Sequence, residues 1–206
     1  MSPKHHPSDE TLTAYAAGAL EPGFGLVAGA HVETCAACRA KVGAFEAASG
    51  EALERLAPEA MASDAWARMA DRLDGRDALA PLRQFTRPLI DRLPLKPRKW
   101  VSPGLWVATV ETPHHPDNRV YLLGAAPGAV TARHSHSGVE FCTVLKGAFR
   151  DEFGAFGAGD FAQADAGDEH QPKVEGREEC ICLFATEGRL KAATAIGRLA
   201  FRYADV

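Results

Sequence analysis

The hydrophobic positions along the chain repeat at helical spacing in the first third and at shorter, strand-type spacing in the second half. Residues 8–10, Ser-Asp-Glu, form a helix-start signal. The apolar residues that follow it three and four positions apart are Leu12, Tyr15, Ala16 and Ala19. This pattern predicts a first helix of about three turns that ends before Pro22.

Small residues fill the next stretch, and helical spacing resumes at Cys35. The apolar residues of this second stretch are Cys38, Val42, Phe45, Leu53 and Leu56. They predict a longer helix with a break near Gly50. A further helix is expected from Ser63-Asp64 to Gly75, with Trp66, Met69 and Leu73 on one face. Residues 1–75 therefore read as a small helical bundle.

From residue 76 to residue 104 the helical rhythm stops, and prolines recur. We interpret this segment as an extended linker with one short helical turn near residues 89–93. Short β-type runs between Gly, Pro and Asp then predict a small antiparallel barrel or sandwich. These runs are 105–110, 120–124, 139–145, 148–153, 160–164 and 180–185. The expected fold is α+β with two domains, 1–75 and 105–206, and residues 190–203 are left open between a helix and a strand pair.

Charge divides the chain in the same way. Residues 1–75 carry 6 basic and 11 acidic side chains, residues 76–104 carry 7 and 2, and residues 105–206 carry 10 and 14. Because Lys and Arg drive binding to phosphate backbones, the acidic first part argues against direct nucleic-acid binding and favours docking on a basic protein surface. A polar N-terminus and no apolar run of about 18 residues predict a cytoplasmic protein without a membrane span.

One imidazole and two thiols stand close together in the first part. His31, Cys35 and Cys38 lie at spacings of four and three, which place residues on one face of a helix. Zn²⁺ prefers such ligands, and a structural zinc site needs one more, for which His5 and His6 are candidates. The alternative is a redox-active or buried cysteine pair beside an unrelated histidine.

A second group of metal-type residues lies in the β part. His134 and His136 are two apart, so both rings point to the same side of a strand, and Glu140 has the same parity. His170 is expected to come from a neighbouring strand. Three imidazoles and one carboxylate suit Zn²⁺ and also iron, manganese, nickel or copper, so the residues leave the metal's identity open.

Three further cysteines belong to the β part. Cys142 shares parity with Glu140 and is expected to point inward near the metal. Cys180 and Cys182 share a strand face, where neighbours two apart are too distant for an unstrained disulfide. Buried inert thiols and oxidant sensing are both compatible with these positions.

The residues around the second group resemble the two cupin motifs. The first motif runs from Gly128 to Gly147 and matches in every position. The second starts at Gly159 and departs at Asp165 and Val174, where cupins usually have Pro and often have Asn. The metal-ligand positions of cupins correspond here to His134, His136, Glu140 and His170.

A His-x3-Cys-x2-Cys helical module followed by a cupin resembles, over essentially the whole chain, the ChrR family of zinc-containing anti-sigma factors. The resemblance implies an extracytoplasmic-function sigma factor as partner, bound by the first module and released under singlet oxygen or organic peroxide stress through the cupin. The zinc ligands that it implies are His6, His31, Cys35 and Cys38.

Two other functions are compatible with these residues. A metal-dependent cupin enzyme of the dioxygenase type would use the second group for turnover, with the first module as a regulator. A zinc-dependent DNA-binding repressor is disfavoured by the net −5 charge of residues 1–75, which follows from their 6 basic and 11 acidic side chains. We therefore expect a non-enzymatic anti-sigma factor.

Overall fold

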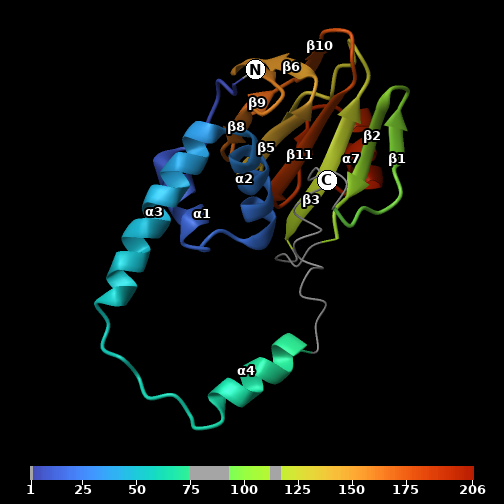
Figure 1. The fold of residues 1–206 in the computed structure, drawn as a ribbon. Coiled ribbons are helices and arrows are strands. Elements are labelled where there is room, and N and C mark those ends of the chain that lie inside the picture. Colours follow the sequence, from blue (N-terminus) through green and yellow to red (C-terminus); the bar gives the residue numbers. More distant parts are fainter. Residues whose placement is uncertain (1, 75–92, 112–116) are drawn as a thin grey trace.

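A helical N-terminal part lies against a β sandwich in the computed structural model of the protein, which describes residues 2–74, 93–111 and 117–206 (Figure 1). The helices are α1 (Asp9–Ala16), α2 (Pro22–Thr34), α3 (Ala36–Glu54), α4 (Ala65–Asp74) and α7 (Ala195–Ala204). The strands are β1 (Lys99–Ser102), β2 (Leu105–Thr109), β3 (Asn118–Ala125), β4 (His134–Ser135), β5 (Glu140–Lys146), β6 (Ala148–Asp151), β7 (Gly154–Gly157), β8 (Phe161–Ala164), β9 (Glu169–His170), β10 (Lys173–Glu175), β11 (Cys180–Glu187) and β12 (Lys191–Ala192). The α+β class expected from the sequence is confirmed, and the described strands form a sandwich without closing into a barrel.

The helix starts follow local capping chemistry. Ser8 caps α1, because its Oγ accepts from the N–H of Thr11 at 3.1 Å. Glu21 caps α2 by accepting from the N–H of Gly23 at 2.9 Å, and Pro22 occupies the first helical position. The small-residue stretch before His31, for which no helix was predicted, belongs to α2. The predicted break near Gly50 is wrong, since α3 continues to Glu54.

Three antiparallel sheets make up the sandwich. The large sheet has the strand order β1-β2-β3-β11-β5-β8, and the two small sheets have the orders β10-β6-β7 and β12-β4-β9. All strand pairs in them are antiparallel. Because β1 begins at Lys99, regular β structure starts inside the segment interpreted as a linker. Apart from Leu93, the short turn expected at 89–93 lies outside the described residues.

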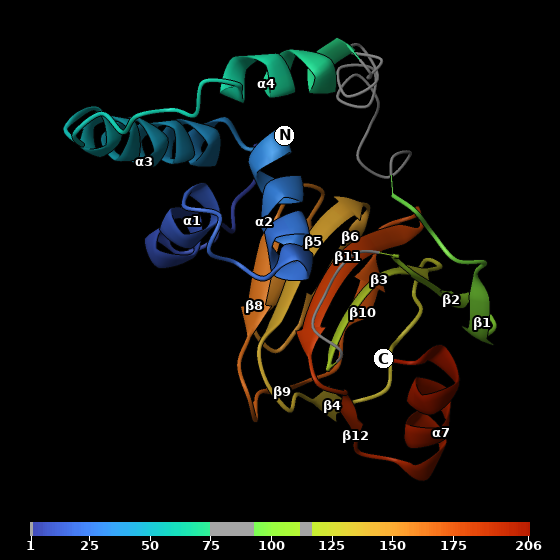
Figure 2. The same cartoon turned by 90° about the horizontal axis from the view of Figure 1, so that it is seen from below.

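The central strands of the large sheet, β3, β11 and β5, are buried on both faces. Helix α2 lies across one face, where it contacts β3, β5 and β11 (Figures 1 and 2). Phe24, Val27 and Ala30 of α2 belong to the same buried cluster as sheet residues such as Phe141. The hydroxyl of Thr143 donates to the carbonyl of Val27 at 2.8 Å. The helical and β parts therefore share one apolar core.

The opposite face of the large sheet packs against β6, β7 and β10. The buried residues of this second cluster are Ala125, Cys142, Val144, Phe149, Phe156, Val174, Cys180 and Cys182. The C-terminal stretch that the sequence left open contains one short strand, β12, which pairs with β4, and then the helix α7, so the helix alternative is confirmed. Within the described residues, no helix is long and apolar enough to cross a membrane.

Candidate metal centres

The first metal-type cluster sits where α2 turns into α3. His31 lies in the last turn of α2, Cys35 is both the C-cap of α2 and the N-cap of α3, and Cys38 lies in the first turn of α3. Cys35 has an extended backbone, with φ −102° and ψ 107°. The expectation that one helical face carries these residues is therefore wrong, and the change of chain direction at Cys35 brings the thiols to His31.

Four ligand atoms converge at this junction, all within 4.8 Å of one another. His6 Nδ1 lies 3.4 Å from His31 Nε2, from Cys35 Sγ and from Cys38 Sγ. His31 Nε2 lies 3.2 Å from Cys38 Sγ. A tetrahedral zinc site with the usual bond lengths has ligand separations of about 3.3–3.8 Å, so this cluster has the size and chemistry of a structural zinc site.

The surroundings prepare these side chains for a metal ion. The Nδ1–H of His31 donates to the carbonyl of Gly159 at 2.7 Å, which leaves the Nε2 lone pair directed at the cluster. Burial lowers the pKa of His31, which favours this neutral form. Burial and the neighbouring Cys35 act in the other direction, because they raise the pKa of Cys38 to about 11 without a metal, so a metal ion must displace the thiol proton. His5 is not in the cluster, because its Nε2 contacts the carbonyl of Ala155 at 3.1 Å.

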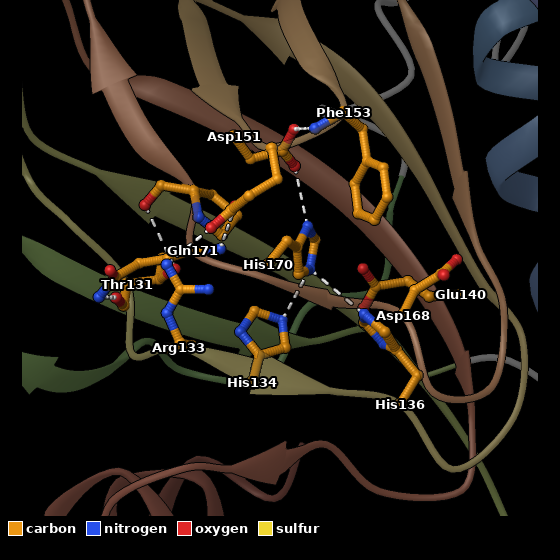
Figure 3. A network of polar contacts seen from close by, with 12 residues as sticks. Thr131, Arg133, His134, His136, Glu140, Asp151, Phe153, Asp168, His170 and Gln171 are labelled. Carbon is orange, nitrogen blue, oxygen red and sulfur yellow. Dashed lines mark hydrogen bonds and ion pairs between the residues drawn. The ribbon is translucent and has the colours of Figure 1, made fainter.

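The second cluster joins His134, His136, Glu140 and His170 inside the sandwich (Figure 3). Antiparallel pairing of β4 with β9 places His134 opposite His170, as the sequence analysis expected for a neighbouring strand. The Nε2 atom of His170 lies 3.0 Å from that of His134 and 3.2 Å from that of His136. All four residues are buried, with 3–6% of their surface exposed.

Two imidazoles in this cluster have their lone pairs fixed. His134 donates through Nδ1–H to the carbonyl of Ala132 at 2.8 Å, and His170 donates through Nδ1–H to the Asp151 carboxylate at 2.8 Å. When both rings are neutral, their Nε2 atoms face each other as two acceptors, so a metal ion between them or a proton on His170 Nε2 is favourable. Glu140 Oε2 is likewise buried without a hydrogen-bond partner among the described residues. The donor set therefore fits a divalent transition metal.

Burial also sets the protonation of the metal-free cluster. Burial lowers the pKa of His134 and His136 to about 4, and the nearby His170 adds to this effect. Burial raises the pKa of Glu140 to about 7. Burial opposes the positive charge on His170, but the hydrogen bond to Asp151 and the charge of Glu140 give a net rise of its pKa. Asp151, which no motif pointed to, thus orients His170 and supports its charge.

A cavity of about 280 Å³ adjoins this second cluster. Its lining is mainly apolar and includes the candidate ligands His134, Glu140 and His170. Side chains of α7, such as Ile196 and Phe201, line the cavity as well. An empty cavity of about 150 Å³ is enough for benzene, so this cavity has room for an organic molecule somewhat larger than one aromatic ring.

The three further thiols line the same cavity. Cys142 points inward beside Glu140, as its strand parity predicted. The sulfurs of Cys180 and Cys182 are 3.7 Å apart, and all described cysteines are free thiols. Burial raises the pKa of Cys142. A hydrogen bond between the neighbouring thiols, together with burial, raises the pKa of Cys180.

The fold and the two clusters define a class of protein, in which a helical module with a zinc-type ligand cluster packs on a cupin that carries a second cluster of metal-type residues. Comparison with known proteins specifies the class further. The family model of the ChrR cupin-like domain matches residues 94–190. The anti-sigma-E factor ChrR of Cereibacter sphaeroides is 37% identical over 206 residues, which cover 97% of each chain. The chain belongs to the ChrR family.

A solved structure agrees with this assignment. The crystal structure of Rhodobacter sphaeroides SigE in complex with the anti-sigma ChrR matches with a TM-score of 0.75 and 39% sequence identity. The match covers 90% of this chain and 100% of that chain. The helical module and the cupin together are thus similar to a solved anti-sigma protein.

Proposed function

We propose that this protein is an anti-sigma factor that binds and inhibits an extracytoplasmic-function sigma factor and releases it under oxidative stress from singlet oxygen or organic peroxide. In this proposal residues 1–75 form the zinc-binding anti-sigma unit, residues 76–104 the linker and residues 105–206 the cupin sensor. The protein would act in the cytoplasm without turning over a substrate. Membership of the ChrR family, whose relative was solved in complex with SigE, supports the proposal.

The observation that carries the proposal is a set of exposed apolar side chains on the helical module. Trp66 and Met69 of α4 are 69% and 48% exposed. Leu53, Leu56 and Met61, which precede α4, are more than 60% exposed. Figures 1 and 2 show α4 standing away from the β body. An amphipathic helix with exposed apolar side chains is a typical docking element for a protein partner.

The metal ions of the proposal have separate roles. Zinc at the first cluster would connect the N-terminus to α2 and α3 and so hold the binding module together. Zinc or another divalent transition metal at the second cluster would belong to the sensor. The proposed ligands are His6, His31, Cys35 and Cys38 for the first site, and His134, His136, Glu140 and His170 for the second.

The experiment uses the full chain and the extracytoplasmic-function sigma factor of its native host. The two proteins should co-purify with two metal ions per anti-sigma chain, and the complex should be inactive in transcription with RNA polymerase. Trp66→Ala should weaken sigma binding about 30-fold or more, as expected for a central aromatic contact. Trp100→Ala is the matched control, because Trp100 is also exposed, at 60%, but lies on β1. If the wild type, Trp66→Ala and Trp100→Ala bind the sigma factor with equal affinity, α4 is not the docking element.

A metal-dependent oxygenase is the second candidate function. The cavity beside Glu140 and the histidines favours it, because a substrate could reach the metal there. Steady oxygen consumption by the iron-loaded chain with small thiols or diols would support this candidate. Loss of that consumption in His170→Ala would assign it to the second cluster.

A further inference from the structure

The N-terminal segment before α1 is bonded to the cupin at the turn between β7 and β8. The backbone N–H groups of Lys4 and His5 both donate to Asp160 Oδ1, at 2.5 and 3.0 Å. The N–H of Phe161 donates to the carbonyl of His5 at 3.1 Å. Asp160 is 4% exposed, and its Oδ2 accepts from the N–H of Gly157 at 2.8 Å, which holds the carboxylate in place. His5 is therefore fixed to this turn by its backbone, directly before the candidate ligand His6.

The same turn also holds a second candidate ligand. The carbonyl of Gly159 accepts from His31 Nδ1–H at 2.7 Å, and the ring of Phe161 lies edge-on to the His31 ring at 6.1 Å. Two of the four first-cluster ligands thus depend on residues 157–161, His31 by direct contact and His6 through His5. Partners of this kind orient a metal ligand and raise its basicity.

The strands β7 and β8, which flank this turn, also line the cupin cavity. Phe156 lines the cavity and lies 4.5 Å from the ring of His5, measured between ring centroids. Ala162 and Ala164 of β8 line it too, and Ala164 pairs with Glu140 of the second cluster. The segment from Phe156 to Ala164 therefore contacts the surroundings of both clusters. It lies more than 120 positions after His31 in the sequence.

We infer that Asp160 is a positioning residue for the first metal site, so that the cupin determines how long the helical module keeps its metal. The carboxylate fixes the N-terminal segment and the turn that carries Gly159, and these two elements place His6 and His31. Because coupling between sites is reciprocal, a change in the cupin that moves this turn alters metal retention at the first site. This inference rests on the proposed metal site but not on sigma binding.

Cobalt replaces zinc in the test, because thiolate-to-cobalt charge-transfer absorption reports on the cysteine-containing cluster alone. The second cluster has no thiolate among its candidate ligands. Full-length chains are loaded with Co²⁺ and mixed with excess chelator, and the decay of this absorption is followed. Asp160→Ala should release cobalt faster by roughly 10- to 100-fold, the effect expected for loss of an outer partner of metal ligands.

Asp165→Ala is the matched control. Asp165 is an exposed carboxylate just after β8, whereas Asp160 lies just before it. This variant should release cobalt at the wild-type rate. His5→Ala is a second test, from the N-terminal segment. It removes the ring's bond to Ala155 and its contact with Phe156, and it keeps the backbone N–H that donates to Asp160. Loss of one hydrogen bond predicts about fivefold faster release.

The outcomes separate the inference from the proposed function. Wild-type release from Asp160→Ala, or equal acceleration by Asp165→Ala, would overturn the inference, since the effect would then be absent or unspecific. If Asp160→Ala does not fold, as judged by its thermal unfolding curve, an unchanged rate for His5→Ala overturns the inference instead. Sigma binding is measured in a separate experiment. If the chain does not bind the sigma factor, the proposed function is refuted, and the cobalt release rates still test the role of Asp160.

Discussion

Cys38→Ala should unfold part of the protein and leave the rest intact. The core around the first cluster is small, and its buried apolar residues are Leu12, Val32, Cys35, Cys38 and Val42. Burial of its three aliphatic side chains contributes roughly 5–9 kcal/mol at about 1.5–3 kcal/mol each. Structural zinc is worth on the order of 10 kcal/mol in small domains, which is at least as much. Without the metal, α1 and the start of α3 have too little apolar contact to stay folded.

Helix α2 should behave differently, because its other face is packed on the large sheet. Phe24 and Val27 are buried there, and the Thr143 hydroxyl bonds the α2 backbone. In the Cys38→Ala chain, hydrogen exchange should therefore become fast for amides of α1 and the first turns of α3, while amides of α2 and β5 stay protected. Sigma binding should be lost together with the protection of α3.

The control is Cys142→Ala, which removes an equally buried thiol from the β part. Cys38 is 2% exposed and Cys142 is 3% exposed. The control should keep both protection of α1 and sigma binding. The reasoning would be refuted if α1 and α3 stayed protected in Cys38→Ala, or if α2 opened together with them.

Three other predictions concern the cupin part. His134→Ala or His170→Ala should leave sigma affinity near the wild-type value and blunt release by singlet oxygen; equal release from wild type and variants would exclude the second cluster as sensor. The second cluster should bind its metal more weakly as the pH is lowered from about 8 to about 6. The pKa of Glu140 is raised to about 7, so at the lower pH the metal must displace a proton from this carboxyl group. Competition with a zinc chelator measures the affinity, and a Glu140→Gln chain with the wild-type pH dependence would contradict the prediction. Gly124→Ala should lower the free energy of unfolding by about 1–3 kcal/mol in denaturant titration, because its new Cβ would lie 2.1 Å from the ring of Trp106; an unchanged midpoint would show that the ring moves freely.

Local sequence patterns were sufficient for the fold class, for the residues of the second cluster and for three residues of the first, and they left the fourth open between His5 and His6. Strand parity placed Glu140 and Cys142 on the inner face, because side chains alternate strictly along a strand. The spacing of His134 and His136 placed their rings in one cluster for the same reason. Helix α1 starts after Ser8 as its capping pattern indicated, since a cap is a contact between residues close in sequence.

Helix α2 shows where these patterns fail. It is covered by α1 and α3 on one side and by the large sheet on the other, so its buried residues do not form a single stripe. Periodicity detects a helix that is apolar on one face, and a helix buried on several faces lacks that signal. The turn at Cys35 was missed for the same reason. The sequence therefore did not show that His31, Cys35 and Cys38 come from the junction of two helices.

What the sequence determined by itself was the chemistry, namely which imidazoles, thiols and carboxylates are available and which of them share a strand or a helix start. The tertiary structure decided which of them meet. The structure places His6 in the first cluster and His5 outside it. The backbone N–H of His5 donates to Asp160, and its ring contacts the carbonyl of Ala155 instead of the cluster. The tertiary structure also brought Asp151 to His170 and Gly159 to His31. Such contacts join residues 19 and 128 positions apart, and no local pattern encodes them because they depend on how whole elements pack.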